Sequence, residues 1–163
     1  MRGNLARLDL GAQTVVADAA ETVRWWDGNA FDRILVDAPC SGTGTLGRNP
    51  EIKWRLTLGD LAELHDRQVA ILRSALAQVA PGGRIIYSTC SLEKEENENV
   101  VEQALSENKS FRTLDCRAEL DHLKEQGDMV WDDTVSLTRG PYLRTIPGIH
   151  ACDGFFAAIL EKI

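Results

Sequence analysis

The sequence predicts an α/β domain with a mainly parallel sheet. Short apolar segments rich in β-branched residues alternate along the chain with longer segments whose apolar residues recur at helical spacing. This alternation is typical of strands joined by crossover helices. The 163 residues, 44% of them hydrophobic and 26% charged, are enough for one domain with one ordinary core.

The first third of the chain predicts two strands. The segment NLARL near the N-terminus indicates the end of a charged helix. Thr14–Ala17 (TVVA) predicts a short strand, and Asp18 behind it is a suitable N-cap for a following helix. Phe31–Ala38 (FDRILVDA) predicts a second strand, which ends at Pro39.

The middle of the chain predicts two helices and a strand between them. One broad apolar face runs through a long helix from Thr57 to about Val79, and Ala80–Arg84 (APGGR) is expected to end it. Arg84–Thr89 predicts the third strand. The next helix, Lys94–Lys109, is acidic at its start, as the helix dipole favours.

The last third gives weaker signals. Residues 115–140 are expected to be rich in loops, and Gly154 to about Leu160 predicts a final apolar strand. The glycines at 82 and 83 resemble a cofactor loop, but a cofactor loop follows a strand and opens a helix. Here the predicted order is reversed, so these glycines indicate a helix-to-strand turn.

Charge and hydropathy restrict the classes of function. The formal net charge is −7 and no basic block is present, so an RNA ligand would need a small local patch rather than a broad basic face. No apolar run approaches the roughly 20 residues that span a bilayer. The N-terminus lacks the apolar stretch of a signal peptide, which makes the cytoplasm the expected location.

The four cysteines, Cys40, Cys90, Cys116 and Cys152, show no CxxC spacing. Zinc binding and thioredoxin-type redox chemistry are therefore disfavoured. The three histidines also lack ligand spacing, so we expect no metal. Cys116 and Cys152 are expected to be free thiols.

Two of the cysteines follow predicted strands. Cys40 comes three residues after Asp37, and Cys90 stands between Thr89 and Ser91. If the two strands are neighbours, both thiols face one cleft at the carboxyl edge of the sheet. The pair is then a redox couple, a metal site, a nucleophile with a helper, or two small core residues. A thiolate beside a carboxylate suits addition to an electrophilic ring carbon such as that of a pyrimidine.

Three segments carry a resemblance to a known family: VDAPCSGTGTLGRNPEIKWR, APGGRIIYSTCSLEKEENENVV and LRTIPGIHACDGFFAAIL. They resemble the Nop/Sun family of RNA (cytosine-5) methyltransferases, most of all its bacterial Sun branch (RsmB-type, Fmu), which acts on 16S ribosomal RNA. The resemblance implies a Rossmann-like class I methyltransferase fold. It also implies methylation of C5 of a cytosine in RNA, with S-adenosylmethionine as cofactor.

The resemblance assigns roles to the two strand ends. Cys90 would be the nucleophile that adds to C6 of cytosine, and Cys40 would assist release of the product. Asp37 would contact the base edge or the sulfonium side of the cofactor. Ala19 and Pro39 join Asp37 and Asp18 as cofactor-binding positions, with Asp18 on the adenine side.

The target base must leave its stack to reach such a pocket. Arg48, Lys53 and Arg55 follow the Cys40 loop and are predicted to contact RNA, with Trp54 as a stacking surface. An alternative fits the same residues equally well: they form one face at the start of a helix, and Trp54 is buried. The remaining matched or aromatic positions are expected to be structural: Arg144, His150, Trp25, Trp26 and Trp131.

The family's first cofactor motif, D-x-C-A-A-P-G-G-K-T, does not occur in the sequence. We therefore expect residues 1–163 to form a partial catalytic domain that is truncated at the N-terminus, without the first two strands and the cofactor loop. Thr14–Ala17 would then lack a partner, and Phe31–Ala38 would have an open edge. Such a chain should bind S-adenosylmethionine weakly and be inactive alone. The alternatives are a non-catalytic α/β binding module and a transfer RNA (cytosine-5) methyltransferase.

Overall fold

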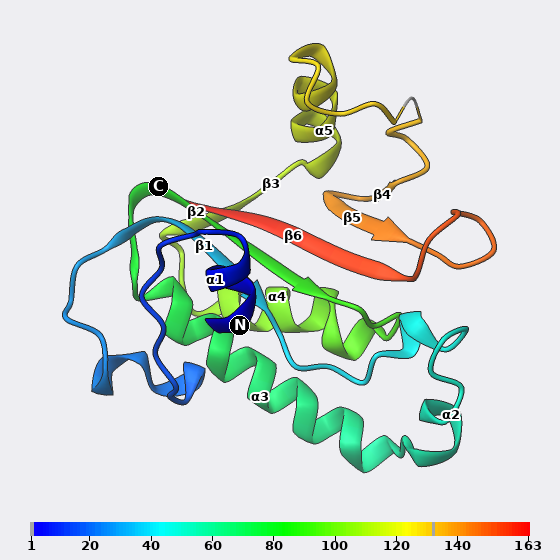
Figure 1. Cartoon of the computed structure of the whole chain (residues 1–163), viewed down its shortest axis with the longest axis horizontal. Coiled ribbons are helices and arrows are strands. Elements are labelled where there is room, and N and C mark those ends of the chain that lie inside the picture. The colour runs from blue at the N-terminus through cyan, green and yellow to red at the C-terminus, as the bar shows by residue number, and fades with distance from the viewer. Residues whose placement is uncertain (1, 132) are drawn as a thin grey trace.

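A computed structural model describes residues 2–131 and 133–163 (Figure 1). In this part of the chain, six strands form one sheet in the order β1-β2-β6-β5-β4, and β3 pairs with the same edge of β6 as β5. The strands are β1 (Phe31–Asp37), β2 (Val79–Thr89), β3 (Phe111–Leu114), β4 (Thr138–Arg139), β5 (Tyr142–Thr145) and β6 (Phe155–Lys162).

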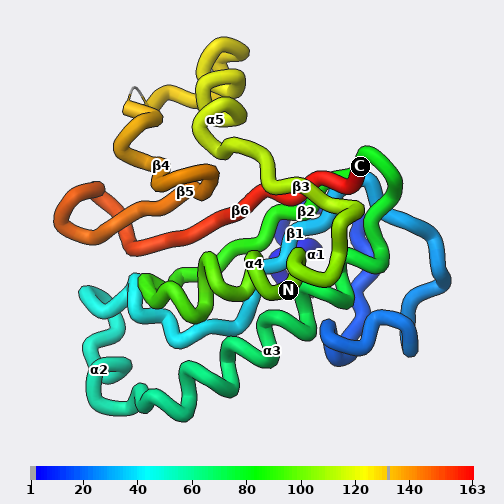
Figure 2. Tube along the Cα trace, turned by 180° about the vertical axis from the view of Figure 1, so that it is seen from behind, coloured from blue at the N-terminus to red at the C-terminus, as the bar shows by residue number. Residues whose placement is uncertain are grey.

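Helices α3 and α4 lie together on one side of the sheet, as both views show (Figures 1 and 2). Their apolar residues meet those of β2 and β6 in the core, where Leu72, Ile85, Val100 and Leu160 are fully buried. The helices are α1 (Arg2–Arg7), α2 (Ile52–Arg55), α3 (Leu58–Leu76), α4 (Glu98–Ser106), α5 (Cys116–Glu125), and the 3-10 turns η1 (Ala19–Arg24), η2 (Thr43–Thr45) and η3 (Lys94–Glu96).

The pairing of β1 with β2 brings the two cysteine loops to one end of the sheet. The two strands are parallel, with Asp37 opposite Ser88, so the chain leaves both at the same edge. β1 ends the strand order, and the side chain of Leu35 is 69% exposed. The expected strand at Phe31–Ala38 and its open edge are confirmed.

The expectation of a mainly parallel sheet is wrong for the described residues. β1–β2 is the one parallel pair among their six strands, and β6 runs antiparallel to β2, β3 and β5. Parallel neighbours need a crossover of a dozen or more residues. β4 and β5 are joined by two residues, and β5 and β6 by nine, so these neighbours reverse direction.

Two expected elements near the sheet differ from the structure. Thr14–Ala17 is not a strand: Val16 is 95% exposed, and the described residues provide no strand beside it to share backbone hydrogen bonds. The long helix ends at Leu76 instead of Val79, because Phe31 N donates to the Gln78 carbonyl at 2.8 Å and draws the following residues into β2.

Residues 115–140 contain more structure than expected. Asp115 accepts a hydrogen bond from Arg117 N at 2.9 Å and caps α5. Cys116 is the buried residue of this helix, so its sequence lacks the apolar stripe that reveals longer helices. Strand β3, Phe111–Leu114, was also unforeseen.

Candidate active site

The thiols of Cys40 and Cys90 lie next to each other, as the two strand ends predicted. Their Sγ atoms are 3.4 Å apart in the loops that follow β1 and β2, and both side chains are half-buried and free of disulfides. One thiol can donate a hydrogen bond to the other. The pair therefore forms the centre of the candidate site.

The two thiols differ in their environments. Burial raises the pKa of Cys40 from 9.0 to about 12, and the hydrogen bond and charge of Cys90 add to the rise. Cys40 consequently keeps its proton at neutral pH. It is available as a hydrogen-bond donor to a thiolate on Cys90.

A buried carboxylate joins the two cysteine loops. Glu96 is fully buried, and its Oε1 accepts from Ser41 N at 2.8 Å and Gln68 Nε2 at 2.9 Å. Its Oε2 accepts from Ser91 Oγ at 2.5 Å and from Ser41 Oγ. Sequence reasoning missed Glu96, and the available signal was that each cysteine is followed by a serine.

Two glycines allow a third segment to approach these loops. Gly44 N donates to the Cys90 carbonyl at 2.9 Å, and Gly154 N donates to the Gly44 carbonyl at 2.8 Å. A Cβ on Gly44 would stand 2.2 Å from the Gly154 carbonyl oxygen. The close contact thus requires glycine at position 44 and fixes the segment before β6 against the site.

Arg144 and His150 hold backbone around the site. Arg144 donates to the Leu92 carbonyl at 2.6 Å and to Glu98 Oε1 at 2.9 Å, just beyond the Cys90 loop. His150 is buried and bridges Ile146 N, at 2.9 Å, and the Ser136 carbonyl, at 3.0 Å. Both contacts are structural, in agreement with expectation.

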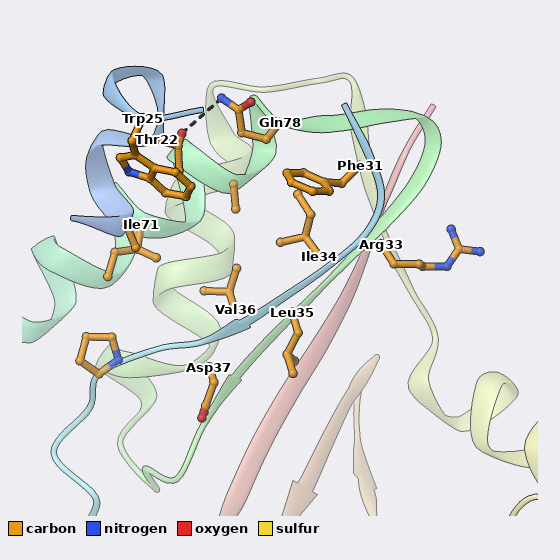
Figure 3. Close-up of a pocket in the computed structure, with 13 residues that line it drawn as sticks. Thr22, Trp25, Phe31, Arg33, Ile34, Leu35, Val36, Asp37, Ile71 and Gln78 are labelled. Carbon is orange, nitrogen blue, oxygen red and sulfur yellow. Dashed lines mark hydrogen bonds between the residues drawn. The ribbon is translucent and has the colours of Figure 1, made fainter. Parts of the chain in front are cut away.

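A pocket of about 420 Å³ opens beside β1, between this strand, η1 and α3 (Figure 3). Ile34 and Val36 point towards Ile71 of α3, while Leu35 points to the other side of the strand (Figure 3). This alternation is that of an extended strand, and it gives the pocket an apolar wall. Asp37 stands at the carboxyl end of that wall (Figure 3).

The predicted cofactor positions lie at this pocket or beside it. Ala19, Asp37 and Pro39 line it. Asp18 caps η1 by accepting from Ala20 N at 2.9 Å, so its expected capping role is confirmed. Trp25, which was expected only to pack, forms part of the wall; its Nε1 donates to the Asp18 carbonyl at 3.0 Å.

The pocket suits a ligand with a flat ring and a positive centre. Its aliphatic and aromatic wall can cover a heterocycle. Its carboxylate, Asp37, belongs to the last residue of β1 and points to the same side of the strand as Leu35 (Figure 3). A cation held by Asp37 would therefore lie at the carboxyl end of the pocket.

The three predicted RNA-binding residues have different surroundings. Arg48 forms an ion pair with Asp153. Lys53 Nζ lies 5.2 Å from the ring centre of Trp54, whose side chain is 81% exposed, so the alternative of a buried Trp54 is wrong. Arg55 lines a hollow of about 360 Å³ together with Ser41, the neighbour of Cys40.

The described residues offer neither a cluster of metal ligands nor a membrane-spanning helix. Within residues 2–131 and 133–163, no group of three or more His, Cys, Asp or Glu side chains is arranged to hold a metal ion. No helix in the same ranges is both long and apolar enough for a bilayer.

Comparison with known proteins gives a family match over nearly the whole chain. The model of the 16S rRNA methyltransferase RsmB/F family matches residues 1–161. Two similar proteins are named ribosomal RNA small subunit methyltransferase B. The protein from Vibrio cholerae is 40% identical over 162 residues, and that from Pseudomonas syringae pv. tomato is 44% identical over 163. The alignments cover 99% and 100% of this chain. They cover 33% and 34% of the two relatives, so the chain spans about a third of their length.

Solved structures share the fold. The crystal structure of PH0851 superposes with a TM-score of 0.82 at 31% identity, over 99% of this chain and 33% of the other. NSun6 from Pyrococcus horikoshii, solved with SFG, gives a TM-score of 0.76 at 28% identity, over 99% of this chain and 38% of that protein. The chain thus matches a continuous part of larger proteins.

Proposed function

The chain belongs to the 16S rRNA methyltransferase RsmB/F family, and we propose that the protein transfers a methyl group to C5 of a cytosine in small-subunit ribosomal RNA. The observation that carries this proposal is the pair of thiols, 3.4 Å apart, beside a pocket that ends in a carboxylate. A methyltransferase that acts on nitrogen or oxygen has no need of a nucleophilic cysteine. The names of the relatives support ribosomal RNA as the substrate.

S-adenosylmethionine is the cofactor in this proposal. The apolar wall of the pocket, whose lining includes Ala19 and Pro39, would cover the adenosyl part. Asp37 would hold the sulfonium side by charge attraction. When bound, the cofactor supplies the methyl group. A structural neighbour solved with SFG, an analogue of this cofactor, supports the choice.

Cys90 is the proposed nucleophile. Its thiolate adds to C6 of cytosine and forms a carbon–sulfur bond, which makes C5 electron-rich. After C5 has gained its methyl group, its proton passes to water, the electrons of the C5–H bond re-form the double bond between C5 and C6, and the carbon–sulfur bond breaks so that Cys90 leaves as a thiolate. The protonated Cys40, 3.4 Å away, donates a hydrogen bond that favours this thiolate and so assists release.

RNA binding is proposed at the rim of the Cys40 loop. Arg55 lies beside Ser41, and Lys53 and Trp54 are exposed on the same short helix, α2. Cations beside an exposed aromatic ring suit phosphates and an unstacked base. Arg48 would have to leave its ion pair with Asp153 before it could bind a phosphate. We therefore assign Arg48 a smaller contribution to RNA binding than Lys53 and Arg55.

The proposal applies to the protein as its gene encodes it. The relatives are about three times as long as this chain, so we expect the 163 residues alone to methylate RNA weakly or not at all. The test is incubation of the encoded protein with labelled S-adenosylmethionine and small-subunit ribosomal RNA, followed by nucleoside analysis. Labelled 5-methylcytosine is the expected product.

The two alternative functions predict different results in this experiment. Label in transfer RNA but not in ribosomal RNA would identify a transfer RNA (cytosine-5) methyltransferase. RNA binding without any methyl transfer would identify a non-catalytic α/β binding module. Methylation at another atom of the base would contradict the role of the thiol pair.

A further inference from the structure

The buried carboxylate of Glu96 has an unusual set of partners. Each of the two cysteines is followed by a serine, and both serines donate to this one carboxylate. Ser41 uses its backbone N–H and its hydroxyl, and Ser91 uses its hydroxyl at 2.5 Å. The two serine oxygens lie 3.3 Å apart. A single side chain therefore links the residue after Cys40 to the residue after Cys90.

Helix α3 also holds the carboxylate of Glu96 in place. Gln68 of α3 donates from the same Nε2 to Glu96 Oε1 at 2.9 Å and to the Pro39 carbonyl at 2.8 Å. The carbonyl of Glu96 accepts from the Tyr87 hydroxyl at 2.7 Å. Glu96 is thus held by α3 and β2 while it holds both loops.

The chemistry of these bonds calls for a carboxylate in this position. All four donors are neutral groups, and an ionised carboxylate can accept from all of them because it has acceptor sites only. Burying its charge without partners would be costly, and four hydrogen bonds offset that cost. A neutral amide of the same shape would have to place its nitrogen towards the two serine hydroxyls, and both hydroxyls would have to turn from donors into acceptors. It would also lose the charge that strengthens these bonds, so the link between the two loops would weaken.

We propose that Glu96 is a positioning residue that sets the separation of the Cys40 and Cys90 thiols by holding the serine next to each. The role in catalysis rests on the proposed function, in which Cys40 must reach the sulfur of Cys90 during release. The geometric role, which is to set the distance between the two thiols, does not depend on the proposed function. Removal of the carboxylate frees the two loops to move independently, and the thiols spend less time within hydrogen-bonding distance.

The geometric role is tested by bridging the two thiols. The chain with Cys152→Ser, which removes the exposed thiol, is treated with dibromobimane, a short reagent that alkylates two nearby thiols. Intact mass and peptide mapping give the rate of the Cys40–Cys90 bridge. Glu96→Gln should lower this rate at least about threefold relative to single alkylation of Cys90, a change within the range of coupling between contacting residues.

Milder variants and a matched control keep the test decisive. Ser41→Ala and Ser91→Ala should each slow bridging less than Glu96→Gln, and adding either to Glu96→Gln should have little further effect. Ile85→Val removes a buried methyl group far along β2 and should leave bridging unchanged. Bridging of Glu96→Gln at the unmodified rate, or equal slowing in Ile85→Val, would overturn the proposal.

A second measurement separates this proposal from the proposed function. In the encoded protein, Glu96→Gln should lower kcat for RNA methylation at least about tenfold with KM for RNA little changed, since positioning acts on the chemical steps. If the unmodified protein does not methylate RNA, the proposed function fails, and the bridging rates still decide whether Glu96 positions the thiols. A rise in KM at constant kcat would assign Glu96 to RNA binding instead.

Discussion

The Sγ atom of Cys40 lies 3.4 Å from that of Cys90, across the ends of two paired parallel strands. Burial and the neighbouring sulfur raise the pKa of Cys40 and so hold the proton on its thiol. The proposed function assigns the role of nucleophile to Cys90 and that of helper to Cys40, and the raised pKa of Cys40 supports this assignment. It can be tested in several independent ways.

The variants of the two cysteines should behave in opposite ways. In the encoded protein, Cys90→Ala should reduce methylation by at least about a thousandfold, because no thiolate can add to C6. Cys40→Ser should accumulate a covalent protein–RNA adduct, because release lacks its helper. Denaturing gels with labelled RNA detect the adduct. Methylation by Cys90→Ala at the normal rate would remove Cys90 from the mechanism.

The raised pKa of Cys40 predicts slow alkylation. A rise from 9.0 to about 12 lowers the thiolate fraction at pH 8 by roughly a thousandfold. Iodoacetamide should therefore modify the exposed Cys152 well before Cys40, and modification of Cys40 should accelerate as the pH rises above 9. Peptide mapping over a pH series measures this. Equal rates for the two cysteines at pH 8 would contradict the assignment.

The same shift predicts how stability depends on pH. The unfolded chain loses the Cys40 proton near pH 9.0 and the folded chain near 12, so the stabilisation is complete below 9 and declines between these values. Cys40→Ala should reduce the loss of unfolding free energy between pH 8.5 and 10.5. Urea unfolding at each pH gives the slope, and an unchanged slope would show that Cys40 does not carry the shift.

Asp37 should discriminate ligands by charge. In the encoded protein, Asp37→Asn should weaken binding of S-adenosylmethionine about tenfold, or about 1.4 kcal/mol, because the variant loses the proposed charge contact with the sulfonium. Binding of S-adenosylhomocysteine, whose sulfur is neutral, should change much less. Calorimetry measures both ligands, and Asp32→Asn, at an exposed position of the same strand, is the control. Equal weakening of the two ligands would argue against a charge contact.

Gly44 should tolerate no side chain. A methyl group there would overlap the Gly154 carbonyl, so Gly44→Ala should destabilise the chain by about 1–3 kcal/mol, as overpacking does. Gly47→Ala provides the matched control, since a Cβ at Gly47 has no described neighbour within 4 Å. Thermal unfolding of both variants settles the comparison, and similar melting temperatures would show that the contact can relax.

Lys53 and Arg55 should contribute to RNA affinity through phosphates. Each change to Ala should lower the slope of log K against log salt by about 1, because one phosphate contact releases about one counterion. Lys109→Ala, an exposed lysine beyond α4, should leave the slope unchanged. Filter binding of the encoded protein at several salt concentrations gives the slopes. A loss of affinity with no change of slope would indicate stacking on Trp54 instead.

The sequence alone predicted the parts of the site that depend on local pattern. An apolar strand that ends in a small-residue turn is recognisable at Asp37–Cys40 and again at Thr89–Ser91, and both turns lie where expected. Pairing of neighbouring strands then placed the thiols together. Their separation and the raised pKa of Cys40 could not be predicted, because both depend on how the fold packs the two loops.

Glu96 shows why the remainder of the site could not be predicted. It stands in the acidic segment LEKEENE, where Glu93 and Glu95 resemble it in every local respect. Only the fold buries Glu96 and brings Ser41, 55 residues away, to its oxygens. The pocket wall has the same cause, because Trp25 reaches β1 only through the packing of η1 on α3.

The linkage of two serines through one carboxylate restricts how this site can be inherited or transplanted. Ser41, Ser91 and Glu96 are not adjacent in sequence but are joined by hydrogen bonds. Substitution of one of them therefore leaves a buried donor or acceptor on the others without its partner. A designer who grafted only the two cysteines onto another parallel strand pair would obtain two thiols without a fixed spacing. The transplantable module is therefore five residues: two Cys-Ser dipeptides and the acid that joins them.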